Sequence, residues 1–156
     1  MLKRAILRND GGSHGVAPRM NDDDLRTLLN NSRTVAIVGL STDPTKASSA
    51  IAGILIDAGY EVIPVHPTAA QILGRTAYAT LAEIPVAVDI VDVFRPAAEA
   101  AGIAKQAVAI GATTLWLQLG IASSEARATA ESAGLQYVED RCIGETTERL
   151  RNRARA

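Results

Sequence analysis

The sequence TVAIVGLSTDPTKASSAIAGILIDAG, residues 34–59, contains a strand, a loop and a helix in succession. It begins with a continuous apolar run, Val35–Val38, which is typical of a central parallel strand covered on both faces. Gly39 ends this run. From about Ala47 the apolar residues recur at helical spacing as far as Gly59, where a left-handed residue would close the helix. The stretch therefore predicts one strand–loop–helix unit of an α/β protein.

The loop from Leu40 to Lys46 leads directly into the N-terminus of the predicted helix. Unpaired backbone N–H groups and the positive end of the helix dipole meet at such a point, and both favour phosphate or another anion. Lys46, Ser48 and Ser49 add a positive charge and two hydroxyl groups nearby. We therefore expect a phosphate site at this loop.

Composition limits the classes of protein to consider. The 156 residues are 47% hydrophobic and 3% aromatic, which suits one aliphatic core and a single domain. The 16 Lys and Arg against 17 Asp and Glu give a net charge of -1, which does not support nucleic-acid binding across a broad basic surface. Cys142 is the only cysteine, which rules out an intrachain disulfide. No signal-peptide pattern and no apolar run of about 20 residues is present, so we expect a soluble, cytoplasmic protein without membrane contact.

The remaining chain alternates between strands and helices. Residues 1–20, rich in Gly, Asn and Asp, predict a flexible leader that contains His14, and residues 21–156 predict the domain. A first helix over 23–30 is capped by Asn21 or Asp22. Further strands are expected at 60–65, 88–94, 113–119 and 135–138, and further helices at 97–110, 123–133 and 145–153. Pro96 is expected in the first helical position of the helix at 97–110.

Residues 71–84 are too irregular for a crossover helix and predict a turn at Gly74, an extended piece around Tyr78 and one helical turn. The alternation as a whole predicts an α/β fold, a Rossmann-like doubly wound parallel sheet of about five strands in one domain. Ligands of such folds bind at the carboxyl ends of the strands.

The pattern of a dinucleotide site is incomplete. A G-x-G-x-x-G sequence normally follows the first strand, and an acidic residue about 20 positions later binds the ribose. Here only Gly39 is present, with Ser41 in place of the second glycine, and no carboxylate ends the second strand at Val65-His66-Pro67. NAD is therefore disfavoured, and another phosphorylated, adenosine-like ligand is expected.

Six segments in this order resemble the small bacterial CoA-binding proteins: VAIVGLS at 35–41, GYEVIPVHP at 59–67, ILGRTAY at 72–78, VDIVDVFRP at 88–96, LWLQLG at 115–120 and DRC at 140–142. The domain of that family is similar to the CoA-binding domain of the succinyl-CoA synthetase alpha subunit. The resemblance covers residues 22–150 and implies that coenzyme A or an acyl-CoA lies across the carboxyl edge of the sheet.

The resemblance also implies contacts for individual residues. Those implied at the phosphates are Gly39, Leu40, Ser41, Lys46 and Ser48. His66 and Pro67 are implied beside the adenosine. The residues implied along the nucleotide are Phe94, Arg95 and Pro96, and those implied near the pantetheine arm are Gln118 and Gly120. Other interpretations stay open. Phe94 and Trp116 could simply pack the sheet, which is the better explanation for Trp116, and Arg95 could pair with Asp92 or Glu99.

Cys142 has two interpretations. A free cysteine usually packs as a small apolar residue. However, Arg141 and a helix that starts at about Glu145 would favour the thiolate, which could form a reversible mixed disulfide with the thiol of CoA. We therefore include Cys142 among the candidate ligand contacts.

No catalytic or metal-binding set can be assembled from the sequence. His14 and His66 are the only histidines and have no evident partner, and Asp89 and Asp92, three apart in a strand, lie on opposite faces. We therefore expect a protein that binds CoA or acyl-CoA without catalytic residues of its own. Two alternatives remain open: an NAD(P)-binding or CoA-transfer enzyme component that uses groups of a partner or homo-oligomer, and a CoA-sensing interaction module.

Overall fold

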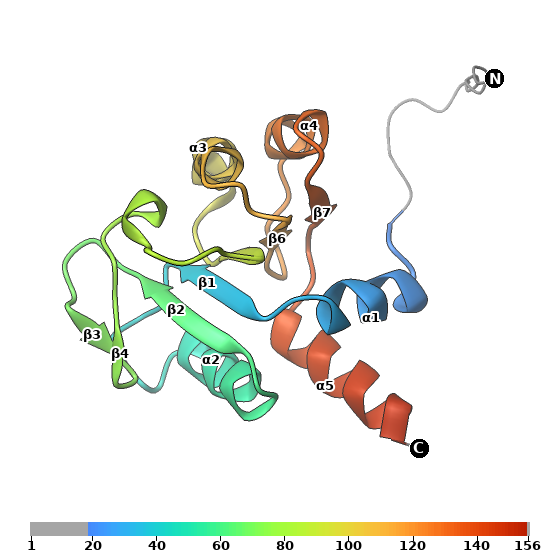
Figure 1. The fold of residues 1–156 in the computed structure, drawn as a ribbon, viewed down its shortest axis with the longest axis horizontal. Helices are drawn as coiled ribbons and strands as arrows, with labels where there is room; N and C mark the ends of the chain where they lie inside the picture. Colours follow the sequence, from blue (N-terminus) through green and yellow to red (C-terminus); the bar gives the residue numbers. More distant parts are fainter. Residues whose placement is uncertain (1–18, 156) are drawn as a thin grey trace.

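A computed structural model describes residues 19–155 of the chain (Figure 1). Its centre is a five-stranded parallel sheet with strand order β2-β1-β5-β6-β7. The strands are β1 (Thr34–Val38), β2 (Glu61–Val65), β5 (Ile90–Val93), β6 (Thr114–Leu117) and β7 (Gln136–Val138). The predicted α/β class and the parallel, Rossmann-like sheet are confirmed.

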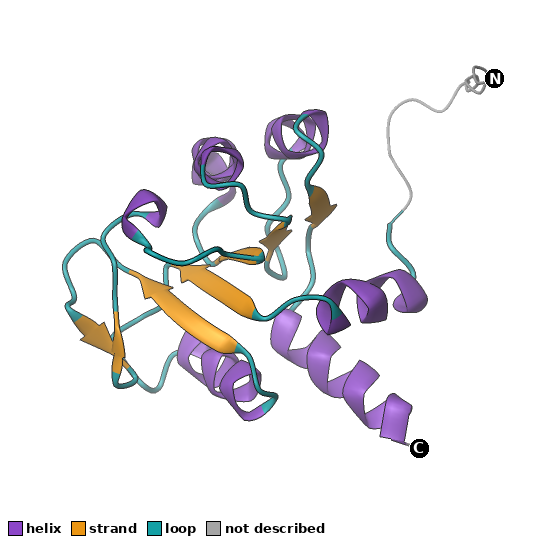
Figure 2. Cartoon of the chain, viewed as in Figure 1, coloured by secondary structure: helices purple, strands orange, loops and turns teal. Residues whose placement is uncertain are grey.

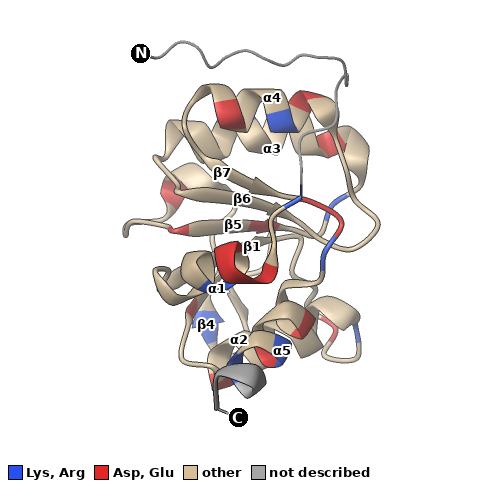
Figure 3. Cartoon of the chain, turned by 90° about the vertical axis from the view of Figure 1, so that its right-hand side faces the viewer, with Lys and Arg blue, Asp and Glu red and all other residues tan. Residues whose placement is uncertain are grey.

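Helices cover both faces of the sheet (Figures 2 and 3). One layer contains α3 (Ala97–Ala109) and α4 (Ser124–Ser132), and the other contains α1 (Asp22–Asn30), α2 (Ala47–Asp57) and α5 (Ile143–Arg155). Each layer buries its own apolar cluster against the sheet. Because strand side chains alternate between faces, Val91 lies in the α3/α4 cluster and Ile90 in the other. Trp116 is fully buried in the second cluster, which supports its interpretation as a core residue.

The predicted helix ends are mostly correct. Asn21 caps α1 through a reciprocal capping box, since its side chain accepts from Asp24 N at 2.8 Å and its N–H donates to Asp24 Oδ2 at 3.4 Å. Pro96, however, occupies the N-cap of α3 rather than its first helical position. The C-terminal helix begins at Ile143 instead of Glu145, because Ile143 is buried and its N–H is bound by the side chain of Gln118, just after β6.

A small antiparallel hairpin, β3 (Gln71–Ile72) and β4 (Arg75–Thr76), follows β2. The sequence predicted only its turn: Leu73 and Gly74 adopt φ values of 55° and 72°, as a tight hairpin requires. Tyr78 then pairs with Val65 as an isolated parallel bridge, and one 3-10 turn, η2 (Leu81–Glu83), precedes β5. This segment replaces the crossover helix between β2 and β5.

The predicted leader falls almost entirely, His14 included, outside the described residues. Its last two residues contact the domain: Arg19 donates to the Asp140 carbonyl, and Met20 packs against the α1/α2/α5 cluster. Among residues 19–155, none of the helices has both the length and the apolar character needed to cross a bilayer.

Candidate functional site

The strand order places a crevice between β1 and β5. If the five strands of the parallel sheet are numbered in chain order, their order in the sheet is 2-1-3-4-5, as in other doubly wound folds. The direction in which successive strands are added reverses between β1 and β5. The chain leaves β1 toward α2 on one face and leaves β5 toward α3 on the other (Figure 1). Ligands in open α/β sheets bind at such switch points, beyond the carboxyl ends of the strands.

A cavity of about 540 Å³ opens at this point. Six of the predicted contact residues line it: Gly39, Leu40, Ser41, His66, Pro67 and Arg95. The other lining residues were not predicted as ligand contacts: Val38, Val65, Ala79, Thr80, Glu99, Ile103 and Gln106. One face of α3 contributes three of them, Glu99, Ile103 and Gln106, which are spaced i, i+4 and i+7. This helical spacing is a sequence signal that could have indicated which side of α3 faces the cavity.

The seven other predicted residues lie outside this cavity, after the carboxyl ends of β1, β5, β6 and β7: Lys46, Ser48, Phe94, Pro96, Gln118, Gly120 and Cys142. Of these, Phe94 is partly buried against the α1/α2/α5 cluster. Its packing is an additional role that the resemblance did not imply.

Gly39 adopts φ = 95° directly after β1. A Cβ atom at this position would lie 2.8 Å from the Phe94 carbonyl oxygen and 2.9 Å from Arg95 Cδ. The glycine is therefore required where the ends of β1 and β5 approach each other. A substitution here disturbs the protein itself, so it does not isolate an effect on ligand phosphates.

The loop after Gly39 is held by its own hydrogen bonds. Ser41 N donates to Ser48 Oγ at 3.1 Å, and Asp43 N donates to Ser41 Oγ at 3.0 Å. The Asp43 carboxylate in turn accepts from the backbone N–H and the hydroxyl of Thr45, and these bonds lower the pKa of Asp43. These hydrogen bonds fix the backbone of the loop.

The N-terminus of α2 is open toward solvent. Lys46 is its N-cap and supplies no side-chain hydrogen bond, and the first turn contains no acidic residue. Within the part of the chain that the structure describes, the N–H groups of Ala47 and Ser48 have no acceptor. By contrast, α1 begins with three aspartates and an Asn cap, and α4 with a Ser cap and a glutamate. The free N–H groups and the dipole of α2 are therefore available to an anion.

His66, at the end of β2, organises its own turn. Its Nδ1 atom accepts from Thr68 N at 3.1 Å and from Ala69 N at 3.0 Å. A ring nitrogen that accepts hydrogen bonds carries no proton, so the neutral imidazole holds its proton on Nε2 and can donate from there. The side chain therefore presents one donor at the edge of the cavity.

Arg95, at the end of β5, pairs with Glu99 rather than with Asp92. Its Nη2 and Nε atoms bind the two carboxylate oxygens of Glu99 at 2.7 and 3.0 Å. These hydrogen bonds raise the pKa of Arg95 and lower the pKa of Glu99. The cavity thus contains a cation and a carboxylate that are bound to each other.

The two aspartates of the third predicted strand do not meet. Asp89 accepts from Arg33 N and Thr34 N at 2.7 and 3.1 Å, at the amino end of β1. Asp92 is fully buried between Ile37 and Trp116 on neighbouring strands, and its oxygens have no partner among the described residues. Burial raises the pKa of Asp92 well above its usual value and so favours the protonated form of its carboxyl group.

The remaining predicted contacts form a group beyond β6. The buried side chain of Gln118 accepts from Ile143 N at 3.0 Å, and Gly120 N donates to Asp140 Oδ1 at 2.7 Å. Cys142 is partly exposed, and its Sγ atom accepts from Glu145 N at 3.4 Å in the first turn of α5. The oxygen of Gln118 is therefore engaged within the protein.

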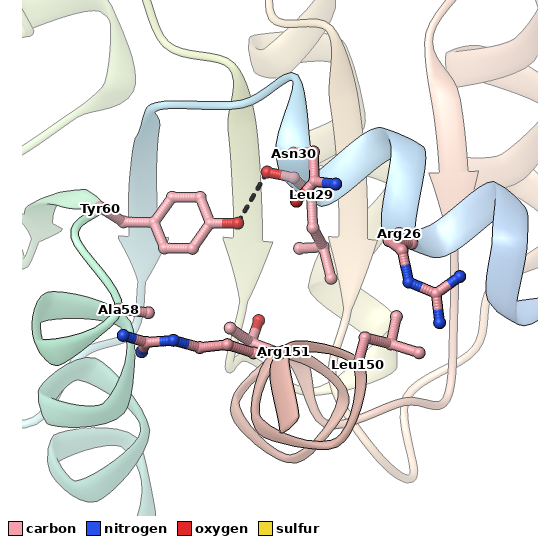
Figure 4. Close-up of a pocket in the computed structure, with 8 residues that line it drawn as sticks. Arg26, Leu29, Asn30, Ala58, Tyr60, Leu150 and Arg151 are labelled. Carbon is pink, nitrogen blue, oxygen red and sulfur yellow. Dashed lines mark hydrogen bonds between the residues drawn. The ribbon is translucent and has the colours of Figure 1, made fainter. Parts of the chain in front are cut away.

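A second cavity, of about 230 Å³, lies near the amino ends of β1 and β2 (Figure 4). Tyr60 donates to the Leu29 carbonyl at 2.7 Å, and Figure 4 shows the guanidinium groups of Arg26 and Arg151 pointing to opposite sides. Arg26 pairs with Asp23 in the first turn of α1 at 2.9 Å, and Arg151 belongs to α5. This cavity lies at the edge of the sheet opposite the start of α2.

Comparison with known proteins gives a direct result. A family model described as a CoA binding domain matches residues 33–147 of the chain. The chain belongs to this CoA-binding domain family. Bacillus subtilis YneT is 36% identical over 120 residues, which cover 77% of this chain and 89% of that protein.

Solved structures share the fold of this CoA-binding domain. A protein from Pyrococcus horikoshii OT3 is 31% identical with a TM-score of 0.82, and the match covers 87% of this chain and 98% of that one. A protein from Thermus thermophilus is 34% identical with a TM-score of 0.80, over 84% and 99%. An acetyl-coenzyme A synthetase from Ca. Korarchaeum cryptofilum, in complex with phosphate and ADP, is 26% identical with a TM-score of 0.61. That match covers 74% of this chain but only 27% of the synthetase.

Proposed function

We propose that this protein binds coenzyme A, or an acyl-CoA, across the carboxyl edge of its sheet, with the ligand phosphates at the start of α2. The observation that carries the proposal is the uncapped N-terminus of α2 beside the cavity at the switch point. Lys46 adds a positive charge there, and the Ser48 hydroxyl oxygen accepts a hydrogen bond from Ser41 N at 3.1 Å. Membership of the CoA-binding domain family and the similarity to an acetyl-coenzyme A synthetase support CoA as the ligand.

The other predicted residues fit an extended ligand. The adenosine would lie toward His66 and Pro67 at the end of β2, and the nucleotide would pass Arg95 at the end of β5. The pantetheine arm would continue along the sheet edge past Gln118 and Gly120 to Cys142. This path follows the order of neighbouring strands in the sheet, from β2 across β1 and β5 to β6.

Nicotinamide dinucleotides fit this site less well. The loop after β1 has only Gly39 of the usual glycine fingerprint, and the end of β2 has no carboxylate for the ribose hydroxyls. A carboxylate does reach the cavity from α3, but Arg95 already occupies both oxygens of Glu99. Those two residues are the charged groups that line the cavity. We therefore propose ligand binding without catalysis by the described residues that line this cavity.

The proposal is tested by calorimetric titration of ligand-free protein with CoA, comparing Lys46→Ala with Lys105→Ala. Lys105 is the matched control because it is an exposed lysine on α3 that does not line the cavity. Loss of Lys46 should weaken CoA binding roughly threefold to tenfold, as expected for one partly solvated contact between opposite charges. Loss of Lys105 should leave the affinity unchanged. Equal effects of the two substitutions would contradict a contact between Lys46 and the ligand phosphates.

A further inference from the structure

Arg95 and Glu99 hold each other at the mouth of the cavity. Arg95 is the last residue before Pro96 and α3, and Glu99 lies in the first turn of that helix, so the pair bridges the strand end and the helix start. The stem of Arg95 lies against Gly39, since a Cβ atom there would come within 2.9 Å of Arg95 Cδ. The guanidinium is thereby fixed beside the loop after β1.

The charges in the cavity therefore cancel before any ligand arrives. Arg95 is the cation among the residues that line it, and both oxygens of Glu99 already accept from that guanidinium. A phosphate that approaches Arg95 meets a carboxylate in the position it would take. However, the side chains of the pair are 46% and 47% exposed, and an ion pair in such contact with water holds only weakly.

We infer that Glu99 limits the affinity for phosphate-bearing ligands, because a phosphate group of the ligand must displace its carboxylate from Arg95. This inference rests on the proposed function. A dianionic phosphate accepts the same two parallel hydrogen bonds from a guanidinium as a carboxylate does, with more charge. A neutral ligand group cannot make this exchange. Glu99 therefore lowers the affinity of ligands whose phosphate binds Arg95 and leaves the affinity of ligands without phosphate unchanged.

The alternative interpretation is that the pair only stabilises α3, because arginine and glutamate four residues apart support many helices. The chain contains a matched example for comparison. Arg127 and Glu131 form the same i,i+4 pair on α4, with Nε and Oε2 3.2 Å apart, and neither residue lines the cavity.

The test is calorimetric titration of CoA, and of pantetheine, which carries no phosphate, into the wild type and a set of variants. The single variants are Glu99→Gln, Glu131→Gln and Arg95→Gln, and the last is compared with the double variant Arg95→Gln/Glu99→Gln. Glu99→Gln should bind CoA about twofold to fivefold more tightly than the wild type, because the ligand no longer has to break an exposed ion pair of that strength. The gain should shrink when Arg95 is absent, and neither Glu131→Gln nor the use of pantetheine should reproduce it.

Two results would overturn the inference while leaving CoA binding intact. In the first, the Glu99→Gln variant binds CoA only as tightly as the wild type, or more weakly. In the second, its affinity for pantetheine rises as much as its affinity for CoA. A gain with Glu131→Gln would equally show that helix stability, and not the cavity, controls the affinity. Failure of the wild type itself to bind CoA is a separate outcome, which would refute the proposed function and the inference together.

Discussion

Replacement of Asp92 by asparagine should remove a pH dependence of stability that is built into the sheet. Asp92 is fully buried on the central strand β5, and neither of its oxygens has a partner among the described residues. Burial raises the pKa of its carboxyl group well above the usual value. The folded protein therefore keeps the proton at pH values where the unfolded chain releases it.

The sign and the size of the effect follow from this difference. Below about pH 4 both states are protonated and the raised pKa costs nothing. Above it, ionisation favours the unfolded chain by about 1.4 kcal/mol for each pH unit, until the pH reaches the pKa of the folded state. An asparagine side chain has nearly the same shape as aspartate and does not ionise. The free energy of unfolding of D92N, minus that of the wild type, should therefore rise between pH 5 and pH 6, by up to about 1.4 kcal/mol.

Urea unfolding of both proteins at pH 5, 6 and 7 measures this difference, with Asp57→Asn as the control because Asp57 is an exposed residue of α2. The control should show a much smaller change with pH. A difference between D92N and the wild type that stays constant from pH 5 to pH 6 would show that Asp92 is ionised in the folded protein, contrary to the effect expected from its burial.

Two further predictions concern the loops at the carboxyl edge. Gly39→Ala should lower the free energy of unfolding by at least about 1–2 kcal/mol, because the new Cβ atom would meet a positive φ and a 2.8 Å approach to the Phe94 carbonyl oxygen. The control Gly53→Ala, in open space on α2, should not destabilise the protein. Thermal melts compare the two variants, and equal melting temperatures would contradict the stated role of Gly39. Incubation with CoA disulfide should add one CoA to Cys142, as its thiolate attacks the disulfide and releases one CoA thiolate, and dithiothreitol should reverse the addition. Intact-mass measurement of wild type and Cys142→Ser tests this, and a wild type that binds CoA but gains no mass would leave the cysteine with a packing role.

The sequence was sufficient for most elements because their signals are local. The apolar run of β1, the helical spacing of α2 and the cap at Asn21 each lie within a few consecutive residues. The hairpin β3–β4 was missed because its strands are two residues long, which is too short for a periodic pattern. The start of α5 was placed two residues late because it depends on Gln118, 25 positions earlier in the chain.

The candidate site was only partly predictable for the same reason. The anion-binding loop could be inferred from sequence, since a helix start and its preceding loop are adjacent in the chain. The reversal of strand order between β1 and β5, which opens the cavity, is a tertiary property with no local signature. Glu99 was named as one possible partner of Arg95, but its position in the cavity depends on how α3 packs on the sheet.

The most direct test of the proposed function is the selectivity of the ligand-free protein among three ligands. Separate calorimetric titrations with CoA, NAD and NADP compare ligands that all carry an adenosine and phosphates but differ in the groups that the site must recognise. The incomplete glycine fingerprint and the missing ribose carboxylate after β2 predict that CoA binds most tightly. Tighter binding of NAD or NADP than of CoA would contradict it.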